Sequence, residues 1–196
     1  MLVAPSAARA EGSGFLFAGG GVSIPVADSN WNQSAEPGPV VKAGAAIHRG
    51  IGAMATVELG DVHVSSAASL YPIYASDPTL RRLRVLGHLI YEQPNALESG
   101  FALTLHAGLG FDRVYAHYEQ VIAATALPHS ETYNGLALEL GAAVWFDLGT
   151  GIDLGVALAI PIATHSATHL SGDPVGFNYT SFDLDLMAAV RFTSGD

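Results

Sequence analysis

The end of the chain, residues 182–192, alternates apolar with small or polar side chains without interruption. A repeat of two residues predicts a β-strand. This strand is about twice as long as the ~5–6 residues usual in soluble proteins, and aromatic residues stand at both of its ends. A tilted strand that crosses a lipid bilayer has this length and these ends. One face carries Phe182, Leu184, Leu186, Ala188, Val190 and Phe192, and the other carries Asp183, Asp185, Met187, Ala189 and Arg191.

The composition limits how such strands can be arranged. The chain has 196 residues, the size of one domain, of which 49% are hydrophobic and 13% are charged, and its mean hydropathy is +0.33. No uninterrupted apolar run approaches the ~18 residues that a transmembrane helix needs. The apolar residues are therefore spread over alternating segments. A closed barrel pairs every backbone N–H and C=O of such strands inside lipid.

Charge and cysteine content exclude two kinds of function. The formal net charge is -10, with only eight Lys and Arg residues, so a nucleic-acid partner is not expected. Cysteine is absent, which excludes disulfide bonds and thiolate chemistry.

The same alternation recurs along the chain, and long and short connections follow each other in turn. In the first strand the apolar track changes parity at the three glycines 19–21, which predicts a β-bulge there. The predicted strands are residues 14–26, 40–48, 51–60, 82–91, 101–112, 136–146, 152–160 and 182–192. The predicted long connections are residues 28–39, 65–78, 119–132 and 161–178, and the short ones are 49–50, 93–95 and 149–151.

These features predict an all-β fold, an eight-stranded antiparallel up-and-down transmembrane β-barrel with short periplasmic turns and long extracellular loops. Residues 1–10 end in Ala-Arg-Ala and are interpreted as the remnant of a signal peptide, which leaves 11–196 as a single barrel domain. Aromatic residues lie where two interfacial girdles are expected. They are Tyr91, Phe101, Phe146 and Phe192 on the short-turn side, and Phe111, Tyr115, Tyr133 and Phe182 on the loop side.

The pattern resembles the small eight-stranded outer-membrane barrels of Gram-negative bacteria, such as the OmpA transmembrane domain and OmpX. The last strand resembles the C-terminal recognition signal of that superfamily through Asp185, Val190 and Phe192, although Met187 stands where the pattern often has Gly and four residues follow Phe192. The resemblance implies an outer-membrane location, delivery by the barrel-assembly machinery, contact with outer-membrane lipid and lipopolysaccharide, and a monomer.

Charged and histidine side chains recur on the faces that carry small residues. In a narrow interior they would pair with one another, either as a structural polar core or as the gate of a narrow pore or proton path. The sequence does not decide between these two interpretations. The predicted lumen residues are Lys42, Glu58, Arg82, Arg84, His88, His106, Asp112, Glu139, Asp153, Asp183, Asp185 and Arg191.

The expected function is structural or surface-interacting, through outer loops that carry Trp31, Tyr71 and Tyr74. No cofactor or metal is predicted. Loop histidines without a matching Cys set or a helical register are a weak metal signal. The histidines and acid that could approach one another at the outer rim are His129, His165, His169 and Asp173.

Two alternatives stay open. The lipid A deacylase PagL uses a His-x-Ser pair followed by Asn, and here His169 and Ser171 give the pair, Gly172 replaces the Asn, and Asp183 would be the orienting acid. No catalytic residue is nevertheless predicted. The second alternative is a soluble lipocalin-like barrel, which would turn its Leu, Val and Phe tracks inward around an apolar ligand.

Overall fold

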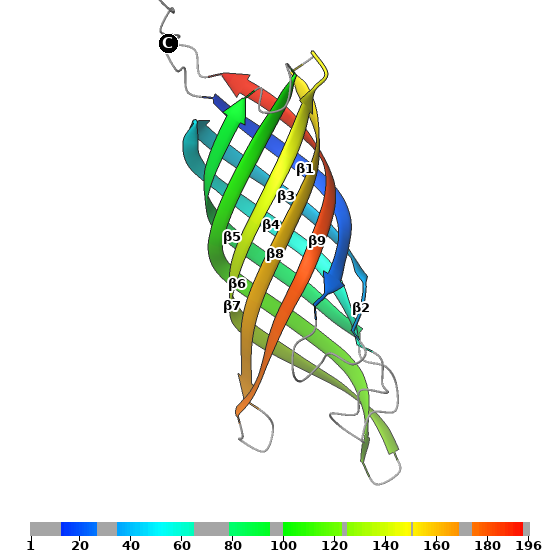
Figure 1. Cartoon of the computed structure of the whole chain (residues 1–196). Coiled ribbons are helices and arrows are strands. Elements are labelled where there is room, and N and C mark those ends of the chain that lie inside the picture. Colours follow the sequence, from blue (N-terminus) through cyan, green and yellow to red (C-terminus); the bar gives the residue numbers. More distant parts are fainter. Residues whose placement is uncertain are drawn as a thin grey trace, which may run out of the picture.

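Long antiparallel strands make up almost all of the chain (Figure 1). The computed structural model describes residues 13–26, 35–64, 79–94, 100–122, 125–149, 151–168 and 174–193. None of these residues forms a helix that is long and apolar enough to span a membrane. The strands are β1 (Ser13–Pro25), β2 (Ala35–Glu36), β3 (Gly38–Arg49), β4 (Ile51–Val64), β5 (Thr79–Pro94), β6 (Phe101–Ile122), β7 (Thr125–Asp147), β8 (Ile152–Thr168) and β9 (Pro174–Thr193).

The sheet closes on itself. Each long strand pairs antiparallel with its neighbours in the chain, and β1 pairs with both β3 and β9. The β4–β5 pairing completes the ring of eight long strands, and the two-residue β2 adds to the loop end of β4. The predicted eight-stranded up-and-down barrel is confirmed.

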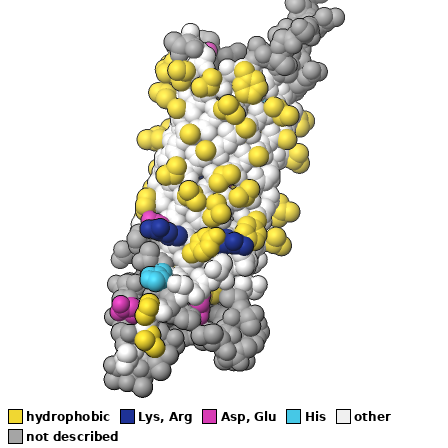
Figure 2. Space-filling model, turned by 180° about the vertical axis from the view of Figure 1, so that it is seen from behind, with side chains coloured by type: hydrophobic (Ala, Val, Ile, Leu, Met, Phe, Trp, Pro, Cys, Tyr) yellow, Lys and Arg dark blue, Asp and Glu magenta, His cyan; other side chains and the backbone are white. Residues whose placement is uncertain are grey.

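The side chains alternate between lipid-facing and lumen-facing positions. Leu136, Leu138 and Leu140 of β7 are exposed on the outside, while Ala137 and Glu139 between them are buried in the lumen. Figure 2 shows the resulting surface, which is covered with apolar side chains over most of the barrel's height. Because the apolar tracks point outward and the charges inward, the soluble lipocalin-like alternative is wrong.

Tight turns join the strands at one end of the barrel. Gly50 between β3 and β4 has a φ of 84°, and Gly149 and Gly151 between β7 and β8 have φ values of 74° and 76°. Glycine adopts this left-handed conformation at little cost, so the strands can reverse within very few residues. Strand β9 ends at this same end of the barrel, and the β6–β7 hairpin projects from the opposite end (Figure 1).

The bulge predicted in β1 is wrong. The pairing of β1 with β9 runs without a slip from Ser13 opposite Thr193 to Pro25 opposite Ser181. The apolar track changes parity because Phe15 and Phe17 point into the lumen, where they are 1% and 6% exposed. The backbone keeps its period of two throughout.

Two predicted loops are largely strand. The connection expected over residues 119–132 belongs to a long β6–β7 hairpin that stays paired as far as Ile122 opposite Thr125. The connection expected over 161–178 is shortened because β8 runs to Thr168 and β9 begins at Pro174. Strand pairing continues here without an alternating apolar pattern, because these segments extend toward the loop end, where no lipid face is required.

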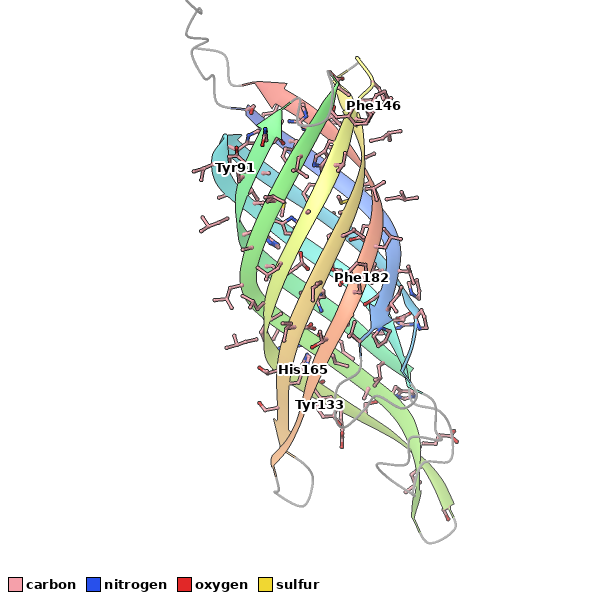
Figure 3. All side chains as sticks on the ribbon, in the orientation of Figure 1. Tyr91, Tyr133, Phe146, His165 and Phe182 are labelled. Atoms are coloured by element: carbon pink, nitrogen blue, oxygen red, sulfur yellow. The ribbon has the colours of Figure 1, made fainter. Side chains whose placement is uncertain are left out.

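The aromatic side chains lie toward both ends of the barrel. Tyr91 and Phe146 are exposed near the tight-turn end, and Phe182 lies farther toward the loop end (Figure 3). Tyr133 does not belong to the loop-side girdle, because it is 3% exposed in the lumen and donates a hydrogen bond to Glu131. Of the other predicted interface residues, Phe101 packs against Phe146 with ring centroids 5.1 Å apart, and Phe111, Tyr115 and Phe192 are exposed.

The facing of β7 can be tested with two neighbouring substitutions. Leu138→Arg places a charge at the middle of a lipid-facing track and should cost about 2–4 kcal/mol of folding free energy. Ala137→Ser points into the lumen and should have a small effect. Denaturant unfolding in lipid vesicles measures both, and equal small effects at the two positions would contradict the facing.

Candidate functional site: the charged lumen

The barrel interior brings together the charged residues expected there. Each residue comes from a lumen-facing strand position, so seven different strands contribute to one narrow space. Among the predicted residues, Lys42, Glu58, Arg82, Arg84, His88, Asp112, Glu139, Asp153, Asp183 and Asp185 are buried, while His106 and Arg191 are partly exposed.

Arg84 of β5 is the centre of the larger ion cluster. Its guanidinium binds Asp112 through Nε at 3.1 Å and Nη2 at 3.0 Å. Its Nη1 lies 3.3 Å from Glu58, 3.5 Å from Asp183 and 3.7 Å from Glu139. One cation therefore contacts carboxylates from four other strands, which compensates for the cost of burying them.

Two further cations complete this central cluster. Arg82 donates a short hydrogen bond to Glu58, and its Nη2 lies 3.8 Å from Asp183. On β3, the Lys42 ammonium lies 3.3 Å from Glu58, 3.3 Å from Asp185 and 3.6 Å from Glu139.

Two serines that sequence reasoning missed hold Asp183. The hydroxyl groups of Ser23 and Ser181 donate to its Oδ1 at 2.5 and 2.8 Å. Both serines occupy lumen-facing positions. Ser181 lies two residues before Asp183, and Ser23 lies six residues after Phe17, so the period of two along each strand could have identified them.

A second, separate cluster lies at the tight-turn end. Arg191 donates hydrogen bonds to Asp153 and, at 2.8 Å, to Glu92, whose carboxylate lies 3.6 Å from His48. Glu92 and His48 were missed because each stands at the edge of a turn, where a polar residue is usually solvated. The predicted lumen residues thus form two clusters.

A layer of apolar side chains lies between the two clusters. Phe15, Phe17 and Trp145 pack with ring centroids 5.4–6.1 Å apart, and Met54 and Met187 belong to the same buried group. A cavity of about 20 Å³ lies on the side of this layer that faces the central cluster and is lined in part by Lys42, His106 and Glu139. The lumen is therefore filled through its cross-section at this level.

His165 occupies a position that the sequence analysis placed in a loop. It lies in β8, is 4% exposed and has its Nε2 atom 3.6 Å from Asp112 in the lumen (Figure 3). The approach of His165 to His129 at the rim is wrong, since His165 pairs opposite Gly135 of β7, six residues along that strand from His129, which pairs opposite Tyr118. His169 and Asp173 lie outside the described residues, as do Trp31, Tyr71, Tyr74 and residues 1–10.

Two histidines approach Glu139 from neighbouring strands. The His88 and His106 rings meet edge to face at 5.2 Å, and His106 Nε2 lies 3.3 Å from Glu139 Oε1. Thr56 Oγ1 lies 2.9 Å from His88 Nε2 and fixes that ring. This arrangement can hold protons or a cation.

A closed barrel with an apolar outer surface and an ion-paired interior defines the class of small outer-membrane β-barrel proteins, which places the chain in the outer membrane. No protein-family model matches the sequence, and no curated protein sequence matches it.

Solved structures share the fold at low sequence identity. A major outer membrane protein of Thermus thermophilus has a TM-score of 0.62 and 12% identity over 92% of this chain and 99% of that chain. Neisserial surface protein A gives 0.54 and 14% over 94% and 98%. Ail, the attachment invasion locus protein of Yersinia pestis, gives 0.54 and 13% over 93% and 99%.

Removing the central cation should destabilise the barrel strongly. Arg84→Met leaves buried carboxylates without their main partner, for which we expect a loss of roughly 3–5 kcal/mol in denaturant unfolding. Arg81→Met is the matched control, because Arg81 is exposed on the outer face of the same strand, and in phosphatidylcholine vesicles it should change stability by less than about 0.5 kcal/mol.

A companion substitution separates charge from packing. Adding Asp112→Asn to Arg84→Met removes one stranded carboxylate and should recover part of the lost stability. If the single Arg84→Met variant were as stable as the native chain, the cluster would not depend on this cation.

Proposed function

We propose that the chain is a plugged outer-membrane barrel that displays the β6–β7 hairpin for contact with another molecule outside the cell. The observation that carries this proposal is the length of the hairpin. Its pairing continues from Tyr115 opposite Thr132 to Ile122 opposite Thr125, beyond the exposed aromatic Tyr115. Seven residues of β6 past Tyr115 correspond to about 24 Å of extended strand. The projection is visible in Figure 1.

The outer part of the hairpin has free edges in the described part of the chain. Pairing of β6 with β5 ends at His117 opposite Thr79, and pairing of β7 with β8 starts at Asn134 opposite Ser166. Within the described residues, 118–122 of β6 therefore pair only with 125–129 of β7, and 130–133 of β7 pair only with 114–117 of β6. Unpaired N–H and C=O groups along such edges can accept an added strand from a partner protein.

The contents of the lumen favour display over conduction. A pore requires a continuous water path, whereas Phe15, Phe17 and Trp145 pack against one another between two ion clusters. The buried charges contact each other directly, as expected for a structural core.

We further propose that the chain acts without catalysis. Asp183, the acid that a PagL-like mechanism would need, is buried and bound by Ser23, Ser181 and Arg84 inside the barrel. The His169 and Ser171 pair lies outside the described residues. An acid so engaged is poorly placed to orient a histidine in an outer loop.

Lipopolysaccharide is the proposed lipid partner. Arg81 and Arg113 face outward on β5 and β6, and Arg113 lies over the Phe111 ring at 5.2 Å and donates to Asn134 at 2.7 Å. Lys and Arg side chains border the apolar surface on the loop side in Figure 2. Guanidinium groups at this height meet the phosphates of an anionic outer leaflet. We also propose that a monomer is inserted by the barrel-assembly machinery, which would read the exposed Phe192 on β9.

Because the native chain has no cysteine, single introduced thiols report on display of the hairpin. Glu119→Cys lies on the exposed hairpin, and Leu148→Cys lies in the tight turn at the other end. We expect a membrane-impermeant maleimide to label Glu119→Cys on intact cells and Leu148→Cys only after outer-membrane permeabilisation.

The same two variants test the interaction. A thiol-attached photocrosslinker should give a discrete adduct with a surface partner from position 119 and none from position 148. Labelling of the hairpin position without any adduct would support its display and refute the proposed contact.

The lipid proposal predicts a composition-dependent stability. The native barrel should unfold at higher temperature in lipopolysaccharide-containing vesicles than in phosphatidylcholine vesicles, with about 1 kcal/mol contributed by each arginine. The Arg81→Ala/Arg113→Ala variant should lose this difference while unfolding normally in phosphatidylcholine. An unchanged difference would contradict the role of these two residues.

A further inference from the structure

We propose that the lumen binds a divalent transition-metal ion, of which Zn²⁺ is the representative, through His88 of β5, His106 of β6 and Glu139 of β7. Each residue offers one ligand atom, and the three atoms lie within 4.8 Å of one another. Two imidazoles and a carboxylate are a donor set suited to first-row transition metals. The ion would link three consecutive strands of the barrel.

Buried polar atoms without a hydrogen bond occur on two of the three proposed ligands. Among the residues that the structure describes, His88 Nδ1 and Glu139 Oε1 are buried and have no hydrogen-bond partner, and His106 Nε2 lies 3.3 Å from that Oε1. The opposite atoms of both side chains are engaged, because His88 Nε2 meets Thr56 Oγ1 at 2.9 Å and Glu139 Oε2 faces Lys42 and Arg84 at 3.6 and 3.7 Å. A metal-bound histidine is commonly oriented through its other ring nitrogen in this way.

Two glycines provide the space that the imidazoles occupy. Gly108 lies between His88 and Glu139 on the paired strands, and Gly141 lies opposite His106. A Cβ atom at Gly108 would overlap the His88 ring near Nδ1, and one at Gly141 would overlap the His106 ring near Nε2. The backbone is therefore shaped to bring both rings toward the carboxylate.

The charge of the central cluster is also consistent with a bound cation. Its cations are Lys42, Arg82 and Arg84, and its carboxylates are Glu58, Asp112, Glu139, Asp183 and Asp185, so three positive charges face five negative ones. With the histidines neutral, the cluster carries an excess of negative charge that one divalent ion balances. The acidic group formed by Glu58, Glu139 and Asp183 already has a cation, since Arg84 Nη1 contacts all three.

The site has room for a further ligand. The cavity of about 20 Å³ is lined by His106, Glu139 and Thr56, and it can hold a water molecule as the fourth ligand. Metal–ligand bonds of about 2.0–2.2 Å require ligand atoms within roughly 4.4 Å of each other, so a small rotation of one ring completes the geometry.

The experiment uses the full chain without an affinity tag, refolded in detergent with Co²⁺ or Zn²⁺ and then dialysed. Heat-dependent mobility on an SDS gel verifies folding of every sample. We expect one metal ion per folded chain, a visible Co²⁺ ligand-field spectrum, and a higher unfolding temperature with metal than without.

The variants distinguish this site from the other histidines. His88→Gln and His106→Gln should abolish the Co²⁺ spectrum, while His117→Gln, on the exposed hairpin, should retain it. Thr56→Val keeps all three ligands and should weaken binding by roughly 10–100-fold, which maintains the test if a histidine variant does not fold. Folded native protein without metal would overturn the proposal, as would native affinity in both His88→Gln and Thr56→Val.

Discussion

Closure of the backbone hydrogen-bond network is the constraint on which the rest of this molecule depends. Inside lipid no water can satisfy an open strand edge, so β1 must pair with both β3 and β9, and β4 must pair with β5. A closed sheet of only eight strands leaves a narrow interior. Alternation then assigns every side chain either to lipid or to that interior. The apolar exterior and the charged lumen are two consequences of the same closed sheet.

A narrow lumen with fixed walls must be filled by side chains of suitable size and charge. Near the tight turns Phe15 and Trp145 fill it with rings, whereas farther along Arg84 spans it and contacts carboxylates of β4, β6, β7 and β9. Long arginine side chains suit this position because one guanidinium has five donors. Small residues such as Gly108 and Ala137 supply the space that these larger groups use.

The sequence predicted the strands, their facing and the lumen residues of β5, because period-two alternation is a local property of the chain. It predicted a bulge in β1 that is not there, since an aromatic side chain inside a barrel, such as Phe15, has the same hydropathy as one in lipid. It also placed His165 in a loop instead of the lumen, because strand pairing beyond the apolar track continues without an alternating pattern. The partners of Arg84 could not be predicted, because they depend on the stagger among strands far apart in sequence.

The charged lumen also specifies that stagger. Shifting β5 by one residue would exchange its faces, turning Arg82 and Arg84 toward lipid and bringing Arg81 and Leu83 into the interior. An apolar exterior alone distinguishes such registers only weakly when both faces of a strand contain apolar residues. Strand β5 is such a case, because Leu86 and Ile90 lie on its inner face. Contacts of Arg84 with carboxylates of four other strands are satisfied together in the native register. The ion cluster thus holds the strands in one register, and that register sets where β6 and β7 leave the membrane and how far their hairpin projects.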